Sequence, residues 1–170
     1  MKKTLLLIVV SIGAFGLGIL AREVWVGHAT PIEPLPQPVL LDLEGQSHRL
    51  EEWSGKVVVL NFWATWCAPC REEMPEFSKI QDELAPRGLQ VIGVAIDDAA
   101  EVEGYLQSFP VHYPILIGDD AAPKWAESLG DSLSVLPFTV VLDRKGRPVA
   151  HHIGIFHRQE LLEAVEPLLN

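Results

Sequence analysis

The stretch NFWATWCAPCREEMP, which occupies residues 61–75, decides how this chain folds. It begins inside an apolar run, residues 57–63, which only Asn61 interrupts and whose length and β-branched residues indicate a strand buried on both faces. After Cys70, apolar residues recur at spacings of three, three and four, at positions 74, 77, 80 and 84, which indicates a helix. A pair of cysteines therefore lies at the junction between a buried strand and a helix.

The same criteria, applied outward from this junction, predict the remaining elements. They predict strands at residues 39–43, 89–96, 113–117, 138–142 and 149–153, and helices at residues 101–109, 124–129 and 158–168. Strands alternate with helices first, and a hairpin followed by a helix closes the chain. We therefore expect an α/β fold in which helices flank a central mixed β-sheet.

The composition excludes several classes of partner. The chain has 170 residues, 48% of them apolar, which is enough for one domain with a well-filled core. From residue 22 onward it carries 11 basic and 23 acidic residues. This acidic charge argues against nucleic acid as a partner, because phosphate binding needs clustered Lys and Arg. It also argues against docking of the domain surface on anionic lipid.

The N-terminal segment is typical of a signal anchor. Lys2 and Lys3 precede residues 4–20, which contain no charge. We expect residues 1–21 to form a transmembrane helix, with the two lysines in the cytoplasm and the body outside. The alternative is a cleaved signal sequence, for which residues 27–29 offer a weak cleavage site.

The anchor is followed by a proline-rich spacer. Residues 22–38 contain Pro31, Pro34, Pro36 and Pro38, and alternating prolines favour extended polyproline II structure. We expect this linker to hold a single domain, residues 39–170, off the membrane.

The two cysteines of the chain, Cys67 and Cys70, are three residues apart, so a bond between them cannot close a long loop. A cysteine at a helix N-terminus faces unpaired N–H groups and the positive end of the helix dipole, which stabilise a thiolate. We expect an exposed Cys67 to form a mixed disulfide with a substrate and a less accessible Cys70 to resolve it. Pro69 between them limits the freedom of the ring that closes.

Two other interpretations of the pair remain open. It could form a plain structural disulfide, or half of a zinc site, which would need two more ligands. No second cysteine pair exists. His151, His152 and His157 could suggest a metal site. His151 and His152, however, point to opposite faces of their predicted strand, so they would not chelate one ion together. We expect no metal site and no cofactor.

Residues 61–75 resemble the active-site stretch of the TlpA/ResA/CcmG-type family of membrane-anchored, thioredoxin-fold thiol–disulfide oxidoreductases, and the resemblance extends over residues 39–170. It implies a thioredoxin-like fold and a single-pass protein of the bacterial cytoplasmic membrane, with its catalytic domain on the periplasmic side. It also implies that the chain reduces disulfides in cysteine-containing substrate proteins, for example apocytochrome c during cytochrome c maturation. A membrane electron donor of thiol type would then re-reduce it. We expect a monomer.

The resemblance also implies roles for residues outside the pair. In thioredoxin-like proteins the proline corresponding to Pro137 is cis and packs beside the two cysteines. Because proline has no N–H, an extended substrate would pair with the backbone around Leu136. Trp66 would cover Cys67 and form part of the docking surface, and Pro75 would kink the helix.

The sequence offers a candidate proton acceptor near the cysteine pair. Cytosolic thioredoxins have a buried Asp where this chain has Asn61, which cannot act as a base. In the ResA-like branch, a Glu at the position of Glu73 lies near the cysteines and tunes them. A partly buried Glu73 would have a raised pKa and could take the proton of Cys70. The alternative is a solvated acid in the first turns of the helix, favoured by the dipole, as we expect for Glu72.

Rival functions make different predictions. The first alternative is an oxidase that forms disulfides, since the dipeptide between the cysteines does not settle the direction. A copper metallochaperone would hold copper through Cys67 and Cys70, and a pure adaptor would not need either cysteine. A lone-cysteine peroxidase is disfavoured, because Ala64 stands where such enzymes have a Thr.

Overall fold

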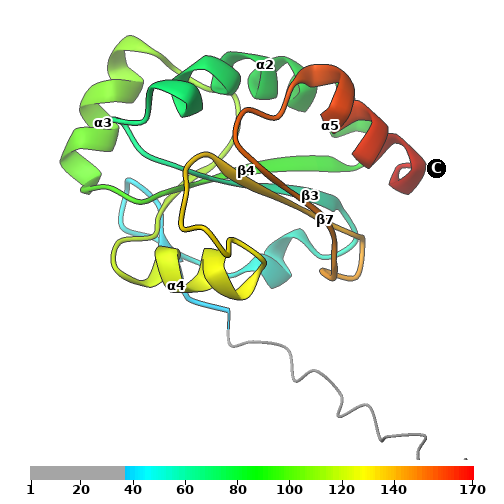
Figure 1. The fold of residues 1–170 in the computed structure, drawn as a ribbon, viewed down its shortest axis with the longest axis horizontal. Coiled ribbons are helices and arrows are strands. Elements are labelled where there is room, and N and C mark those ends of the chain that lie inside the picture. The colour runs from blue at the N-terminus through cyan, green and yellow to red at the C-terminus, as the bar shows by residue number, and fades with distance from the viewer. Residues whose placement is uncertain (1–36) are drawn as a thin grey trace, which may run out of the picture. The chain divides into compact units, whose positions relative to one another are not determined.

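The computed structural model describes residues 37–170, which form an α/β sandwich around one mixed sheet (Figure 1). In this part of the chain the sheet has seven strands in the order β2-β1-β5-β4-β3-β6-β7. Strand β3 pairs in parallel with β4, and β4 with β5, whereas the remaining pairs are antiparallel. The strands are β1 (Leu40–Leu41), β2 (Ser47–His48), β3 (Val57–Trp63), β4 (Leu89–Ala95), β5 (Ile115–Ile117), β6 (Phe138–Leu142) and β7 (Pro148–Ile153).

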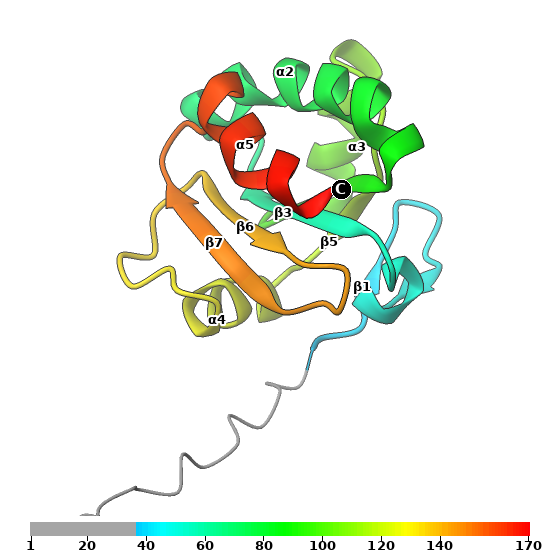
Figure 2. The same cartoon turned by 90° about the vertical axis from the view of Figure 1, so that its right-hand side faces the viewer.

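The helices lie on both faces of the sheet. Figures 1 and 2 show α2, α3 and α5 on one face and α4 on the other. The α-helices are α2 (Ala68–Leu84), α3 (Ala99–Ser108), α4 (Ala121–Ser128) and α5 (Arg158–Val165), and the 3₁₀ helices are η1 (Leu50–Trp53), η2 (Ala85–Arg87) and η3 (Glu166–Leu168). The predicted α/β sandwich with a mixed sheet is confirmed.

The central strand β3 divides the core into two layers because successive side chains of a strand alternate between its faces. Val59 and Trp63 pack under α2, α3 and α5, whereas Leu60 and Phe62 pack against α4. All seven residues of β3 are buried, as the apolar run predicted. Asn61 lies on the face of β3 that α2 covers, so its amide is wholly enclosed.

Two buried strands have their predicted bounds, whereas the other elements differ from their predicted bounds by one or more residues. Residues 57–63 and 138–142 are strands as predicted. The predicted strand 39–43 is reduced to β1, which pairs with the unpredicted β2 across a turn at Gly45 (φ +79°). Helix α4 begins at Ala121 rather than residue 124, because Pro123 falls in the first turn, where its missing N–H leaves no bond unmade.

The predicted anchor, residues 1–21, lies outside the described residues. The predicted linker, residues 22–38, also lies outside them except for residues 37 and 38. Among residues 37–170 no helix is both long enough and apolar enough to cross a bilayer.

Two glycines differ in what a methyl group would meet, and this allows a matched test of packing. A Cβ on Gly118, after β5, would lie 2.3 Å from Ala122 Cβ and 2.8 Å from Val94 Cγ1. A Cβ on Gly104, in α3, would meet nothing within 4 Å. We predict that Gly118→Ala lowers the free energy of unfolding by about 1–3 kcal/mol through overpacking. Gly104→Ala should raise it by about 0.5–1 kcal/mol through helix propensity.

Urea unfolding of the full chain, monitored by tryptophan fluorescence, measures both changes. A stability for Gly118→Ala equal to that of the wild type would show that α4 does not pack against β4 and β5 as described.

Candidate active site

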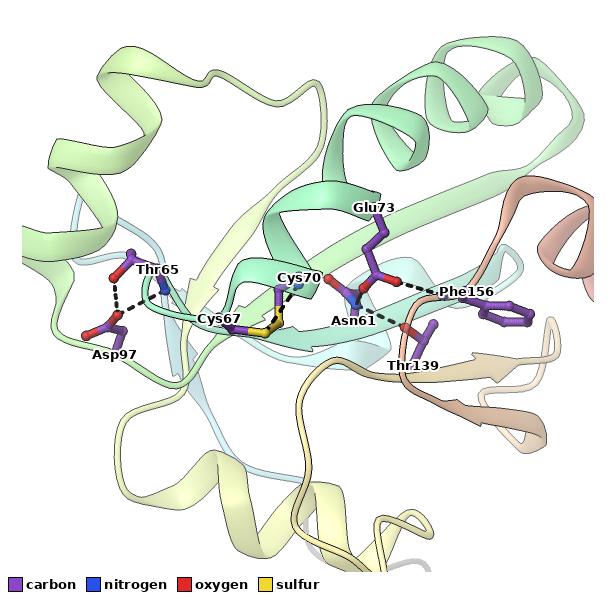
Figure 3. The surroundings of a disulfide bond; sticks show 8 residues. All are labelled: Asn61, Thr65, Cys67, Cys70, Glu73, Asp97, Thr139 and Phe156. Atoms are coloured by element: carbon purple, nitrogen blue, oxygen red, sulfur yellow. Dashed lines mark hydrogen bonds between the residues drawn. A yellow bond between two sulfur atoms is a disulfide. The ribbon is translucent and has the colours of Figure 1, made fainter.

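The two cysteines lie at the start of α2, where the chain leaves the sheet. Strand β3 ends at Trp63, and four residues later Cys67 is the N-cap of α2. The Cys67 Sγ accepts a hydrogen bond from the Cys70 N–H at 3.2 Å and is joined to Cys70 Sγ by a disulfide (Figure 3). The predicted position of Cys67 at a helix N-terminus is therefore confirmed, and Pro75 lies inside α2 rather than before a late helix start.

Cys67 is less accessible to solvent than expected. Cys67 is 5% exposed and Cys70 is fully buried, so Cys67 is the more accessible of the two but is not open to solvent. Its sulfur is bonded to Cys70, and Leu136 packs against the hydrophobic cluster that contains both cysteines. Trp66, in contrast, is 68% exposed.

The loop before β6 carries the proline expected beside the cysteines. The Leu136–Pro137 peptide bond is cis, as the resemblance implies. The buried Asp131 accepts a hydrogen bond from the Val135 N–H at 3.2 Å, and the Pro137 carbonyl accepts one from the Gly154 N–H at 2.8 Å. Both bonds fix the loop at its two ends.

Glu73 is buried, which decides between the two interpretations of its environment. Its side chain is 3% exposed and lies beside Cys70 and Asn61 in Figure 3. One carboxyl oxygen accepts a hydrogen bond from the Asn61 Nδ2 at 2.7 Å, and the other accepts one from the Phe156 N–H at 2.8 Å. Asn61 Nδ2 also donates to the Thr139 hydroxyl at 3.0 Å, across the β3–β6 pair. The expectation of a solvated acid does not hold for Glu73, whereas Glu72 is exposed as expected.

The surroundings of Glu73 raise its pKa toward neutral pH. Burial raises the pKa of Glu73 from 4.5 to about 7, although the bonds from Phe156 and Asn61 oppose the rise. Near neutral pH this carboxyl can therefore both accept and release a proton. Asn61 cannot titrate, but its amide holds the group that does.

A second polar contact, which the sequence analysis missed, fixes the loop that leads to Cys67. One oxygen of the Asp97 carboxylate accepts hydrogen bonds from the Thr65 N–H at 3.1 Å and the Thr65 hydroxyl at 2.5 Å (Figure 3). Asp97 follows β4, which pairs in parallel with β3. A polar residue directly after a buried strand was the available signal, because the carboxyl ends of neighbouring parallel strands meet at one edge.

The histidines of the C-terminal hairpin are separated, as their alternation on β7 predicted. The ring of His152 stacks on Phe156 with centroids 4.4 Å apart, and its Nε2–H donates to the Ile155 carbonyl at 3.0 Å. His151 instead lies against Phe138 on the other face of the sheet. His157 precedes α5 as its N-cap. No group of three or more His, Cys, Asp or Glu within residues 37–170 is arranged to hold a metal ion.

Comparison with known proteins agrees with the geometry of the site. Residues 31–165 match the family described as Redoxin. The chain is 32% identical over 136 residues to the thiol-disulfide oxidoreductase ResA of Geobacillus thermodenitrificans, covering 78% of this chain and 76% of that protein. It is 35% identical over 133 residues to ResA of Halalkalibacterium halodurans, covering 76% and 73%.

A solved structure extends the comparison to the fold. The thioredoxin-related protein of Neisseria meningitidis serogroup B superposes with a TM-score of 0.69 at 31% identity, covering 76% of this chain and 97% of that one. The fold described above is thus thioredoxin-like.

The raised pKa of Glu73 predicts a specific dependence of stability on pH. The carboxyl has a pKa of 4.5 in the unfolded chain and about 7 in the native state. Between these values the native state binds more protons than the unfolded state, so stability falls as the pH rises. In the oxidised full chain, this group removes roughly 3 kcal/mol of stability between pH 4 and pH 8.

We predict that Glu73→Gln, which resembles the protonated form, abolishes this part of the pH dependence. Urea unfolding at a series of pH values measures it, and Glu72→Gln is the matched control at an exposed neighbour. Groups such as His48, whose pKa is raised by its bonds to Asp42 and Glu52, are common to both proteins and cancel in the difference. Parallel profiles for wild type and Glu73→Gln would contradict a buried carboxyl that titrates near pH 7.

Proposed function

Since the chain belongs to the Redoxin family and is a protein thiol–disulfide oxidoreductase, we propose that it reduces disulfides in substrate proteins outside the bacterial cytoplasmic membrane. The observation that carries the proposal is the pairing of Cys67 at the N-terminus of α2 with a buried Cys70, beside a buried carboxyl. Its substrates are proteins with cysteines; apocytochrome c is the specific example that the resemblance suggests.

The first step uses Cys67. In the reduced enzyme its thiolate is stabilised by the Cys70 N–H and by the positive end of α2. This thiolate attacks one sulfur of the substrate disulfide. A bond forms between Cys67 and that sulfur, the substrate S–S bond breaks, and the other substrate sulfur leaves as a thiolate that takes a proton from solvent.

The second step uses Cys70 and Glu73. The ionised Glu73 carboxylate takes the proton of the Cys70 thiol, and the resulting thiolate attacks Cys67 Sγ. The enzyme disulfide forms, the mixed disulfide breaks, and the second substrate sulfur leaves as a thiolate that receives the proton. The substrate gains two electrons and two protons, and the enzyme ends with the Cys67–Cys70 bond seen in the structure.

The charge near the pair supports a reductase rather than an oxidase. When it is ionised, Glu73 places a full negative charge in a buried site beside Cys70, which disfavours the thiolate and so favours the disulfide. The positive N-terminal end of α2 has the opposite effect, since it favours the thiolate of Cys67, but it corresponds to only about half a unit charge. The balance favours a low reduction potential, which requires an electron donor, and a membrane protein of thiol type would supply it.

The rim of the site supports a protein substrate. We assign to Trp66 the role of an exposed aromatic contact, and to the backbone around Leu136 and Pro137 that of pairing with an extended substrate segment. Val135, 44% exposed, adds apolar surface to this loop.

The placement of the protein completes the proposal. Residues 1–21 would anchor a monomer in the membrane as a single-pass helix, and residues 22–38 would hold the domain 39–170 on the periplasmic side. The uncharged run behind Lys2 and Lys3, and the prolines that follow it, support this arrangement.

The reduction potential of the full chain tests the direction of electron flow. Equilibration with defined ratios of glutathione or dithiothreitol, followed by alkylation of free thiols, gives its value. We expect a potential near the reducing end of the thioredoxin range, about −270 mV. A value near −120 mV would overturn the reductase and favour the oxidase.

Variants of the two cysteines test their division of labour. We predict that Cys70→Ser accumulates a mixed disulfide with a protein substrate, because nothing resolves it, whereas Cys67→Ser forms none and loses reduction altogether. Non-reducing electrophoresis and a reduction assay measure these outcomes. An adaptor would keep its function in cells when Cys67 is replaced by Ser, and stoichiometric copper in the purified wild type would point to a metallochaperone.

A further inference from the structure

A groove lies directly beside the cysteine pair, between the first turns of α2 and the end of α3. Its volume is about 640 Å³, which suits two or three side chains of an extended peptide. On the α2 side it is lined by Ala68, Arg71 and Pro75, and on the α3 side by Tyr105, Phe109 and Val111. Figure 1 shows that α3 and the start of α2 lie on the same face of the sheet. The mechanism described above uses none of these side chains.

The wall formed by α3 is an aromatic stack that reaches the core. Phe109 is 60% exposed, and its ring stacks on Tyr105 with centroids 5.1 Å apart. Tyr105 in turn lies against the buried Trp63, with centroids 5.6 Å apart, at the end of β3. An exposed aromatic ring held by a rigid support loses little conformational entropy on binding, which is the property of an interface anchor.

The wall formed by α2 carries a cation without an internal partner. Among residues 37–170, Arg71 makes no ion pair and no side-chain hydrogen bond, whereas Arg87, Arg147 and Arg158 each pair with a carboxylate. Burial raises the pKa of Tyr105, and the nearby Arg71 guanidinium opposes that rise. Arg71 therefore lies close to the aromatic wall, in a body that is acidic overall. The exposed Glu72 also lines the groove.

One lining residue of the groove adjoins the residue that carries the reacting sulfur. Ala68 follows Cys67 directly, so its Cα is ~3.8 Å from that of Cys67, and Arg71 is about one helical turn further along. A substrate whose cysteine reacts at Cys67 would reach the groove with the next two or three residues of its chain, at roughly 3.3 Å per residue.

We propose that this groove binds the segment of the substrate protein that adjoins its reactive cysteine. An apolar side chain of that segment packs against Phe109 and Tyr105, and a carboxylate pairs with Arg71. The assignment rests on the proposed function, since it presupposes a disulfide substrate at Cys67. It adds a determinant of substrate choice supplied by α3, distinct from the backbone pairing at Leu136.

Four short peptide disulfides test the assignment with the full chain in nanodiscs of phosphatidylcholine. The peptides differ at the two residues next to one cysteine, which combine Leu or Ser with Asp or Lys. The second-order rate of reduction of each peptide is divided by the rate with glutathione disulfide measured on the same protein. We expect the Leu–Asp peptide to exceed the Ser–Lys peptide by roughly tenfold or more in this ratio, with the difference in KM.

Variants identify the groove as the source of the preference. Phe109→Ser should remove most of the preference for Leu, and Arg71→Glu should reverse the preference between Asp and Lys. Val149→Ser is the matched control, because Val149 is 49% exposed but lies on β7, away from the groove.

Each outcome decides the assignment. Equal ratios for all four peptides, with normal reduction of glutathione disulfide, would overturn the groove and leave the oxidoreductase intact. Failure to reduce any disulfide would overturn both. Self-association in sedimentation experiments that Phe109→Ser abolishes, with no peptide preference, would show that a second copy of the chain occupies the groove, and would also overturn the assignment.

Discussion

The hydrogen-bonded carboxyl of Glu73 links three segments of the fold around the cysteine pair. It connects α2 to Asn61 of β3 and to the backbone of Phe156, between β7 and α5. Without these bonds a buried carboxyl would be costly, and the rise of its pKa to about 7 shows that the cost is only partly offset. Such a group adds little to stability, but its hydrogen bonds fix the position of the helix that carries both cysteines. A carboxyl buried at this cost has a purpose if its proton is used.

The position of Cys67 follows from what fixes the chain on either side of it. Upstream, the Asp97 carboxylate holds Thr65 at the end of the sheet, so the loop from β3 to α2 has little freedom. Downstream, Glu73 holds the first turns of α2 against β3. Between them, Cys67 can serve as the helix cap only if its sulfur faces the Cys70 N–H, which is the contact observed. The chemistry of the pair is therefore set by two polar contacts in the surrounding fold, rather than by the CxxC spacing alone.

Sequence patterns identified the elements with a long and regular hydrophobic pattern. They missed the elements that form only by pairing with another strand. Residues 57–63 and 138–142 are apolar except for Asn61 and Thr139, so their composition predicts that they are buried. The edge strand β2 exists only because β1 pairs with it, and nothing local in its two residues indicates a strand.

The same distinction holds within the site. Cys67, Cys70 and Pro137 are recognisable from motifs, whereas the state of Glu73 stayed open between burial and solvation. Its spacing of four from Phe77, on the buried face of α2, favoured burial. The donor from Phe156 is 83 residues away, and no pattern along the chain can predict it.

Helix α2 separates two tasks by its two faces. Cys70, Glu73 and Phe77 point into the core, where burial sets the proton affinity of the carboxyl and the accessibility of the sulfur. Arg71 and Pro75, on the other face, line the groove toward α3. Because side chains one residue apart on a helix do not face each other, the outer face can change its charge and shape with little effect on the inner one. A helix of this kind can keep one redox chemistry while its outer face, together with α3, is altered to suit different substrate proteins.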